Sequence, residues 1–140
     1  MAKLGMYGLD DLLEDMEDVM NIPDDTIHDM LDAQADIVVP AQKEQIRTCG
    51  LVDTGQLADS ISRTNKLTTT GIGKSISIYP QGVRNDGTRN AEVGFINEYG
   101  APKRKIKASN WMHNANEKSA DEAANAALSV YDNYLKSKNL

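Results

Sequence analysis

The spacing of apolar residues changes twice along this 140-residue chain, and these changes restrict the folds open to it. Up to Cys49 the apolar residues recur every three or four positions, which is typical of amphipathic helices. Between about residues 65 and 96 they alternate with polar residues, as in half-buried strands. A helical spacing returns after residue 110. The order predicts an α+β fold in a single domain, 1–140.

Two helices are predicted in the acidic helical part, residues 1–50. The first spans about residues 9–20, with an apolar stripe on one face and acidic residues on the other. The second runs to about Thr48, and Asp24 or Asp25 is expected to cap its N-terminus. Pro40 falls inside this second pattern, where it would kink or interrupt the helix.

A short helix is expected after Gly50, which would serve as the C-cap glycine of the preceding helix. Asp53 or Thr54 would cap this short helix. It opens the second part of the chain, residues 51–140, which is expected to hold a small sheet and a C-terminal helix.

Two alternating segments predict a small antiparallel sheet. They lie at residues 76–79 and 91–96, and the polar stretch 81–90 between them contains a turn signal. We therefore expect a hairpin with a long tip, which would be either mobile or a contact element. The residues of this tip considered as partner contacts are Asn85, Asp86 and Arg89.

The last helix is predicted to begin after Ser109 or Asn110 and to pack across the sheet. Its many alanines leave a narrow face that another element can approach closely. Trp111 is expected to anchor the core between sheet and helix. Tyr99 would end a strand and close the core, and Gly100 would supply a positive φ at the turn.

The charge of the chain is unevenly distributed. Residues 1–36 hold eleven acidic side chains and one lysine, whereas residues 37–140 hold ten acidic and fourteen basic side chains. This asymmetry suggests electrostatic complementarity within the fold or between copies of the chain. A well-solvated surface is the simpler interpretation for most of these charges.

A basic loop is formed by four cations within five residues: Lys103, Arg104, Lys105 and Lys107. It has three interpretations: a solvated loop, a docking site for an acidic surface such as the first helix of another copy, or a contact with DNA phosphates. The DNA interpretation is the weakest, because the loop has no aromatic residue to stack on bases and the chain carries a net charge of -6.

Few residues are suited to catalysis or metal binding. Cys49 is the single cysteine, which excludes an internal disulfide and a cysteine-based zinc cage. His28 and His113 have no second ligand at a spacing typical of zinc, although acidic residues share the helix face of His28. No cofactor or metal is predicted, and a non-enzyme is favoured. The absence of an apolar membrane-spanning run and of a signal-peptide pattern predicts a cytoplasmic protein.

The segment Leu51-Val52-Asp53-Thr54-Gly55 resembles the active-site loop of retroviral-type aspartic proteases, which are homodimers. In such a dimer two copies of Asp53 would share a proton and activate water. Gln56 stands where that family has Ala or Ser, and the preceding residues are helical in pattern rather than strand-like. The protease remains the alternative from a different functional class.

A second resemblance covers about Leu51 to Ala115. It consists of Thr54-Gly55 followed by Leu57 and Ser60-Ile61, then Glu98-Tyr99-Gly100 before a long helix. In this order and spacing, the chain resembles the tail-component or tail-completion (neck) proteins of long-tailed bacteriophages. Ala101 and the pair Asn110-Trp111 depart from that family, which often has Thr after Glu-Tyr-Gly and Pro-Phe at the start of the last helix.

The resemblance implies a structural protein of the virion without catalytic activity. Such a subunit would form a homo-oligomeric ring at the head–tail connection, after assembly in the host cytoplasm. Its partners would be the other neck and tail proteins: the connector or stopper, the tail terminator and the tail tube. It would make no membrane contact, and it would meet DNA only in the channel. A tail terminator or minor capsid protein is the alternative within this class.

Overall fold

The helical pattern that follows Pro23 folds as one continuous helix, α2 (Asp24–Thr48), in the computed structural model, which describes residues 12–17, 21–51, 55–70 and 73–140. Pro40 lies inside α2 without ending it. Asp24 and Asp25 belong to the first turn, and Pro23 is the N-cap residue, so the prediction of an aspartate cap is wrong. In the first turn the two carboxylates still interact favourably with the helix dipole.

Helix α2 ends at the position that the expected C-cap glycine, Gly50, predicts. Gly50 has a φ of +72°. Its N–H donates to the Arg47 carbonyl at 3.0 Å, and the Leu51 N–H donates to the Ile46 carbonyl at 3.0 Å. This pair of bonds is the Schellman motif, which satisfies carbonyls that the helix leaves unpaired.

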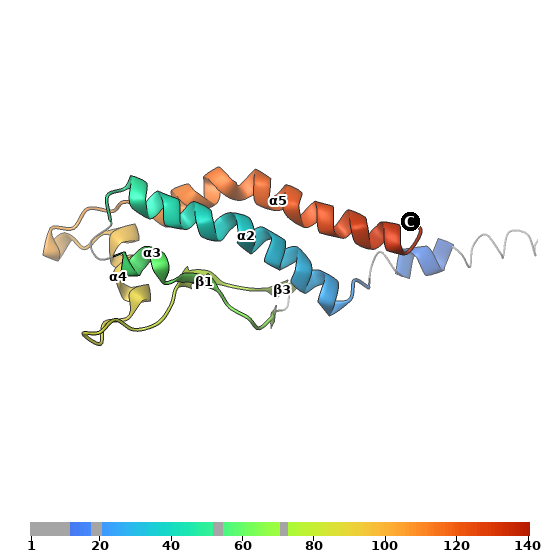
Figure 1. Ribbon diagram of the computed structural model, residues 1–140, viewed down its shortest axis with the longest axis horizontal. Coiled ribbons are helices and arrows are strands. Elements are labelled where there is room, and N and C mark those ends of the chain that lie inside the picture. The colour runs from blue at the N-terminus through green and yellow to red at the C-terminus, as the bar shows by residue number, and fades with distance from the viewer. Residues whose placement is uncertain (1–11, 18–20, 52–54, 71–72) are drawn as a thin grey trace, which may run out of the picture.

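The longest helix, α5 (Trp111–Ser137), runs antiparallel to α2 along most of its length (Figure 1). The side chain amide of Gln42 in α2 donates to Asn116 in α5 at 3.0 Å. The predicted narrow face of small residues is confirmed, because the buried positions of α5 are mostly small and lie four residues apart along the first part of the helix. They are Trp111, Ala115, Ser119, Ala123, Ala127 and Tyr134.

A long irregular hairpin occupies the other side of α2 (Figure 1). Its strands pair antiparallel as β1 (Ile61–Arg63) with β4 (Ile78–Pro80) and as β2 (Thr68–Thr70) with β3 (Gly73–Ser75). Between the two ladders the first arm has four residues and the second arm has two. This excess bulges the hairpin and divides it into two short sheets.

The hairpin is held along α2 by polar contacts that are spread over its length. Arg63 of β1 lies 3.0 Å from Asp32, and Lys74 of β3 pairs with Asp24 near the start of the helix. Near the bulge, His28 makes a hydrogen bond of 3.3 Å with the carbonyl of Asn65. These contacts orient the two-stranded arm toward the N-terminal end of α2.

The second predicted strand, residues 91–96, is wrong: this segment belongs to a helix, α4 (Asn90–Tyr99). The predicted pairing of 76–79 with 91–96 is therefore also wrong, since β4 pairs with β1 instead. The alternation of Ala91, Val93 and Phe95 with other residues misled the sequence interpretation. In the helix Val93 packs against the core and Phe95 is exposed.

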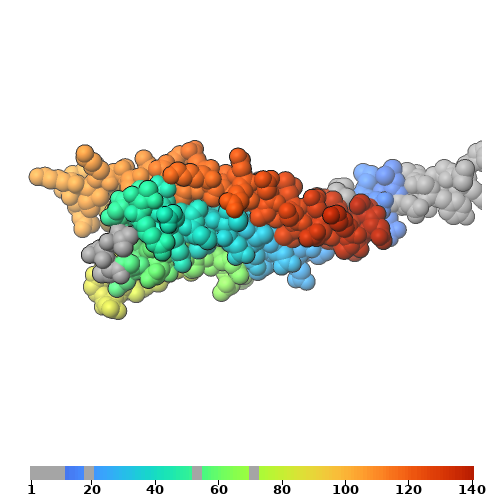
Figure 2. All heavy atoms as spheres, turned by 45° about the horizontal axis from the view of Figure 1, so that its top comes forward, coloured from blue at the N-terminus to red at the C-terminus, as the bar shows by residue number. Residues whose placement is uncertain are grey.

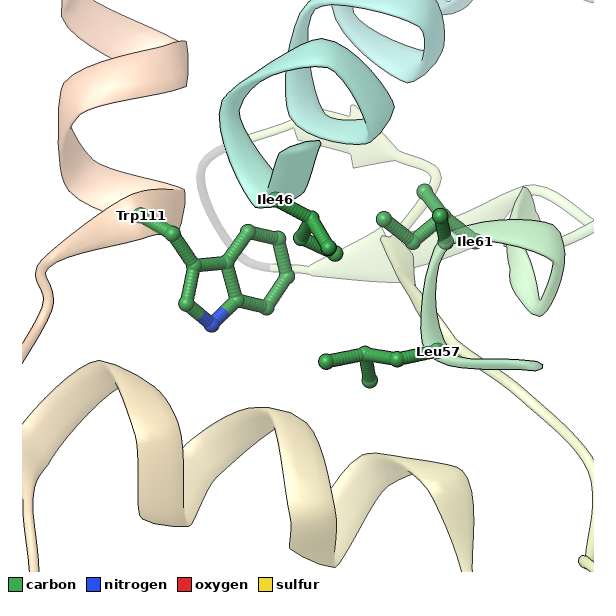
Figure 3. Packing of buried hydrophobic residues seen from close by; sticks show 5 residues of the cluster. Ile46, Leu57, Ile61 and Trp111 are labelled. Atoms are coloured by element: carbon green, nitrogen blue, oxygen red, sulfur yellow. The ribbon is translucent and has the colours of Figure 1, made fainter. Parts of the chain in front are cut away.

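The core lies where the C-terminal end of α2, the hairpin and the first turn of α5 meet. Its fully or almost fully buried members are Ile46, Leu57, Ala58, Ile61 and Trp111 (Figure 3). Leu57 and Ala58 come from the short helix α3 (Gln56–Asp59), whose N-cap is Gly55. The expected short helix is present, but Asp53 and Thr54, proposed to cap it, lie outside the described residues.

Trp111 joins three elements at the centre of this core. Its side chain is 0% exposed, and its indole N–H donates to the Gly94 carbonyl of α4 at 3.0 Å. In Figure 3 the indole points toward Ile46 of α2. Trp111 lies in the same cluster as Ile61 of β1, so the first turn of α5 packs on the sheet. The predicted α+β class and the role of Trp111 as core anchor are confirmed.

Gly94 is the position at which α4 approaches the core most closely. A methyl group there would lie 2.9 Å from Pro80 Cγ and 3.3 Å from Trp111 Cζ2. In an open helix, Gly→Ala stabilises by up to about 1 kcal/mol. Because overpacking costs about 1–3 kcal/mol, Gly94→Ala is expected to lower the free energy of unfolding by about 1–2 kcal/mol. Thermal unfolding followed by circular dichroism checks this; an unchanged or higher midpoint would contradict the close packing.

Candidate functional site

The segments predicted to contact partners gather at one end of the molecule. The tip 81–90 precedes α4, and the basic loop follows it, so α4 connects the two candidate segments. Figures 1 and 2 show both of them at the end opposite to the described N-terminal residues 12–17. The sequence indicated these segments separately, and the fold places them at the same end.

The tip folds as a hydrogen-bonded turn rather than as a long open loop. Val83 bridges to Arg89, and the Arg84 N–H donates to the Thr88 carbonyl at 2.8 Å. Gly87 has a φ of +87°, as the turn signal predicts. Asp86 accepts a hydrogen bond from the Thr88 N–H at 2.9 Å, and this bond holds the pKa of the carboxyl below its ordinary value. Deprotonated Asp86 therefore keeps the turn closed down to pH values below its ordinary pKa.

The base of the tip is fixed by Asn90, the first residue of α4, which is 7% exposed. Its side chain donates to the Gln81 carbonyl at 2.9 Å and accepts from Arg84 at 3.0 Å. Arg89, a predicted contact residue, pairs with Glu92 at 2.6 Å on the solvent side. Of the predicted tip residues, Asn85 and Asp86 are exposed and Arg89 is already engaged by a neighbour.

The basic loop projects from the chain between α4 and α5. It includes the short helix η1 (Pro102–Arg104) and is closed at its base by an antiparallel bridge between Ala101 and Ile106. All four cations are exposed, and Lys105 adopts a left-handed conformation with a φ of 57°. Within the described ranges, no ion pair involves any of these four side chains. Their charge is directed to solvent.

The loop begins at a glycine that no other residue would replace without strain. Gly100 has a φ of +80°, as predicted. A methyl group on its Cα would lie 2.8 Å from the Ala108 backbone nitrogen and 2.9 Å from the Ile106 carbonyl oxygen. The fold requires glycine at this position both for its conformation and for the close approach of residues 106–108, where the loop returns.

α4 buries its polar and small residues and exposes its aromatic ones. Asn90, Gly94 and Glu98 face the interior, four residues apart, whereas Phe95 is 47% and Tyr99 71% exposed. The two rings stack on each other with centroids 6.1 Å apart. The prediction that Tyr99 closes the core is therefore wrong. Sequence reasoning missed this aromatic pair, and its signal was the spacing of four that a helix brings onto one face.

Glu98 was also missed. Its side chain is 4% exposed and lies at the start of α5. The carboxylate accepts hydrogen bonds from the Met112 N–H at 2.6 Å and the His113 N–H at 3.1 Å. Asn110 is the N-cap residue, as predicted, but its side chain makes no capping bond. The cap is instead supplied by a residue of another helix, and it fixes α4, with its aromatic pair, to α5.

At the opposite end, residues 12–17 form a helical segment with two different sides. Leu12, Leu13 and Met16 are 54%, 50% and 48% exposed. Glu14, Asp15 and Glu17 are also exposed, and none of them forms an ion pair with another described residue. The first predicted helix is confirmed over these residues, and the rest of it lies outside the described part.

One group of potential metal ligands exists among the described residues. His28, Asp29 and Asp32 have ligand atoms within 4.8 Å of one another. Asp32 lies 3.1 Å from His28 and 3.0 Å from Arg63 of β1. Asp32 is thus paired with an arginine of the hairpin, and this pairing explains the cluster as a contact that holds the hairpin to α2.

Asp53, the candidate protease residue, lies outside the described residues. Among the described residues, no helix is long and apolar enough to cross a membrane. A scan against protein-family models matched none, and searches of curated proteins and of solved structures found no match.

Proposed function

We propose that this chain is a structural subunit of the neck of a long-tailed bacteriophage, a tail-completion protein that joins head and tail as a member of a ring. It has no catalytic role in this proposal. Its neighbours are the connector or stopper, the tail terminator and the tail tube, and DNA passes only through the channel of the ring. The proposal starts from the resemblance carried by Leu57, Ser60-Ile61 and Glu98-Tyr99-Gly100.

The observation that carries the proposal is the separation of unpaired charge. Exposed carboxylates lie on residues 12–17 at one end, and the exposed cations of the basic loop lie at the other. Opposite charges at opposite ends favour head-to-tail contacts between copies. Head-to-tail contacts close into rings when the rotation between neighbours allows it. A ring is the form that the resemblance implies for a protein at the head–tail joint.

The resembling motifs also have a structural role that suits a scaffold protein. Leu57 and Ile61 belong to the core, and Glu98 caps α5. Each therefore holds helices and hairpin together rather than lining a reaction centre. This distribution supports a structural subunit rather than a catalytic one.

The test is an early stop codon in this gene in the phage that carries it. Negative-stain electron microscopy of the lysate is expected to show full heads beside separate, complete tails. A synonymous change at the same codon is the matched control, and supplying the intact gene from a plasmid should restore joined particles. Normal particles in the stop-codon lysate would overturn the neck function. Tails that are too long or irregular would assign the protein to tail termination instead.

A further inference from the structure

We infer that the helical segment 12–17 of one copy docks on the aromatic pair Phe95–Tyr99 and the adjoining basic loop of a second copy. This inference goes beyond the proposed function, because it names the two surfaces of a head-to-tail contact. It also holds for any assembly of this chain, whether or not the assembly belongs to a phage neck.

The distribution of exposed apolar side chains is the first argument. Eight large hydrophobic residues are exposed among those described, and six of them belong either to the segment 12–17 or to α4 and the tip that precedes it. Three belong to the segment 12–17, and three, Val83, Phe95 and Tyr99, belong to α4 and its preceding tip. Burying such side chains contributes about 25 cal/mol per Å² of apolar surface removed from water. Each end therefore presents an apolar surface that gains from being covered.

Charge complementarity is the second argument, and it indicates which segment binds the aromatic pair and the basic loop. The segment 12–17 carries three exposed carboxylates next to its apolar side chains, at Glu14, Asp15 and Glu17. The aromatic pair is followed, after Gly100, by the four exposed cations of the basic loop. An apolar stripe flanked by acids thus matches an aromatic surface flanked by cations. Two copies of the aromatic surface would instead bring like charges together.

The geometry excludes the same contact within one chain. Helix α2 has 25 residues and is about 37 Å long at 1.5 Å per residue. The six residues 18–23 that precede it span at most about 20 Å. Because α4, which carries the aromatic pair, lies near the C-terminal end of α2 (Figure 1), the segment 12–17 cannot reach the pair in its own chain. The occupant is therefore a second copy.

The first test measures the mass of the purified full-length protein by sedimentation over a range of concentrations. The wild-type chain is expected to rise above the 15.3 kDa monomer as concentration increases. The double variant Leu13→Asp/Met16→Asp and the double variant Phe95→Ser/Tyr99→Ser are each expected to stay monomeric. Leu128→Asp is the matched control, because Leu128 is 53% exposed but belongs to neither surface, and it should associate as wild type does.

Mixing the two double variants distinguishes a head-to-tail contact from a symmetric one. Each variant keeps one intact surface, so the mixture is expected to form a dimer that cannot grow further. A symmetric contact between two like surfaces would instead let the variant that keeps that surface dimerise by itself, without the other variant. Unchanged circular dichroism spectra check that the variants fold. If Phe95→Ser/Tyr99→Ser does not fold, the single variant Tyr99→Ser replaces it, because Tyr99 is the more exposed of the two residues.

The second test exchanges the charges. Glu14→Lys/Asp15→Lys/Glu17→Lys and Lys103→Glu/Arg104→Glu/Lys105→Glu are each expected to abolish association, because every contact would then join like charges. Mixed together, they should associate again, since each reversed surface meets its complement. A wild-type chain that stays monomeric at about 1 mM, where even weak encounters form, would overturn the inference. So would mixtures that fail to associate, or loss of association in Leu128→Asp.

Discussion

Replacing Trp111 with alanine is expected to lower the free energy of unfolding by about 3–5 kcal/mol, the largest effect of any single change in this chain. The indole is fully buried, and it contributes to the cluster that joins α2, α3, β1 and α5. Its removal leaves a cavity, and the Gly94 carbonyl also loses the hydrogen bond from the indole N–H. A loss of this size is a large fraction of the 5–15 kcal/mol typical of a domain.

Urea unfolding followed by circular dichroism measures this effect, since the variant lacks the chain's only tryptophan. Leu128→Ala is the control, because Leu128 lies on the exposed face of α5 and its loss should change stability by no more than about 0.5 kcal/mol. A difference between the two variants below 1 kcal/mol, roughly the cost of a minor core change, would contradict the assigned position of Trp111.

Glu98→Ala is expected to destabilise the protein by about 2–3 kcal/mol. The buried carboxylate accepts two backbone hydrogen bonds at the start of α5; loss of a helix N-cap typically costs about 0.5–2 kcal/mol, and hydrogen bonds to a charged group contribute more than those to a neutral one. Without the carboxylate, the N–H groups of Met112 and His113 lose their partner. Glu98→Gln keeps one acceptor oxygen but loses the charge that favours a helix N-terminus, so an intermediate loss of about 1–2 kcal/mol is expected.

The fluorescence of buried Trp111 follows the unfolding of both Glu98 variants. Glu92→Ala is the control on the same helix, because Glu92 is exposed and makes only a surface ion pair with Arg89. If Glu98→Ala and Glu92→Ala have the same midpoint, Glu98 does not cap α5. If Glu98→Gln is as stable as wild type, the charge contributes nothing to the cap.

Local sequence patterns were sufficient to predict the two long helices. The spacing of apolar residues located α2 and α5, Gly50 located the end of α2, and the alanines indicated the narrow face of α5. These features depend on neighbours three or four residues away, whose influence is read directly from the chain. Trp111, the chain's single tryptophan, was also identified as a core anchor between the sheet and the last helix, and it is fully buried.

The candidate site was predicted in part. The exposed basic loop and the turn at Asn85 and Asp86 follow from charge runs and turn residues. The aromatic pair and the role of Glu98 were not predicted, because residues 91–96 alternate as in a strand and were assigned to one, with Glu98 and Tyr99 at its end. Its true partners are distant in sequence: Trp111 and Pro80 contact Gly94, and the α5 backbone binds Glu98.

From the sequence alone it follows that amphipathic helices flank a region of β-branched strands and that acidic and basic residues are concentrated in different parts of the chain. That α4 is a helix with its polar side inward depends on contacts between segments distant in the sequence. The reason is energetic: the buried side chains of Asn90 and Glu98 satisfy backbone groups of the tip and of α5, and Gly94 leaves room for the indole. These contacts outweigh the strand pattern and leave Phe95 and Tyr99 exposed to solvent.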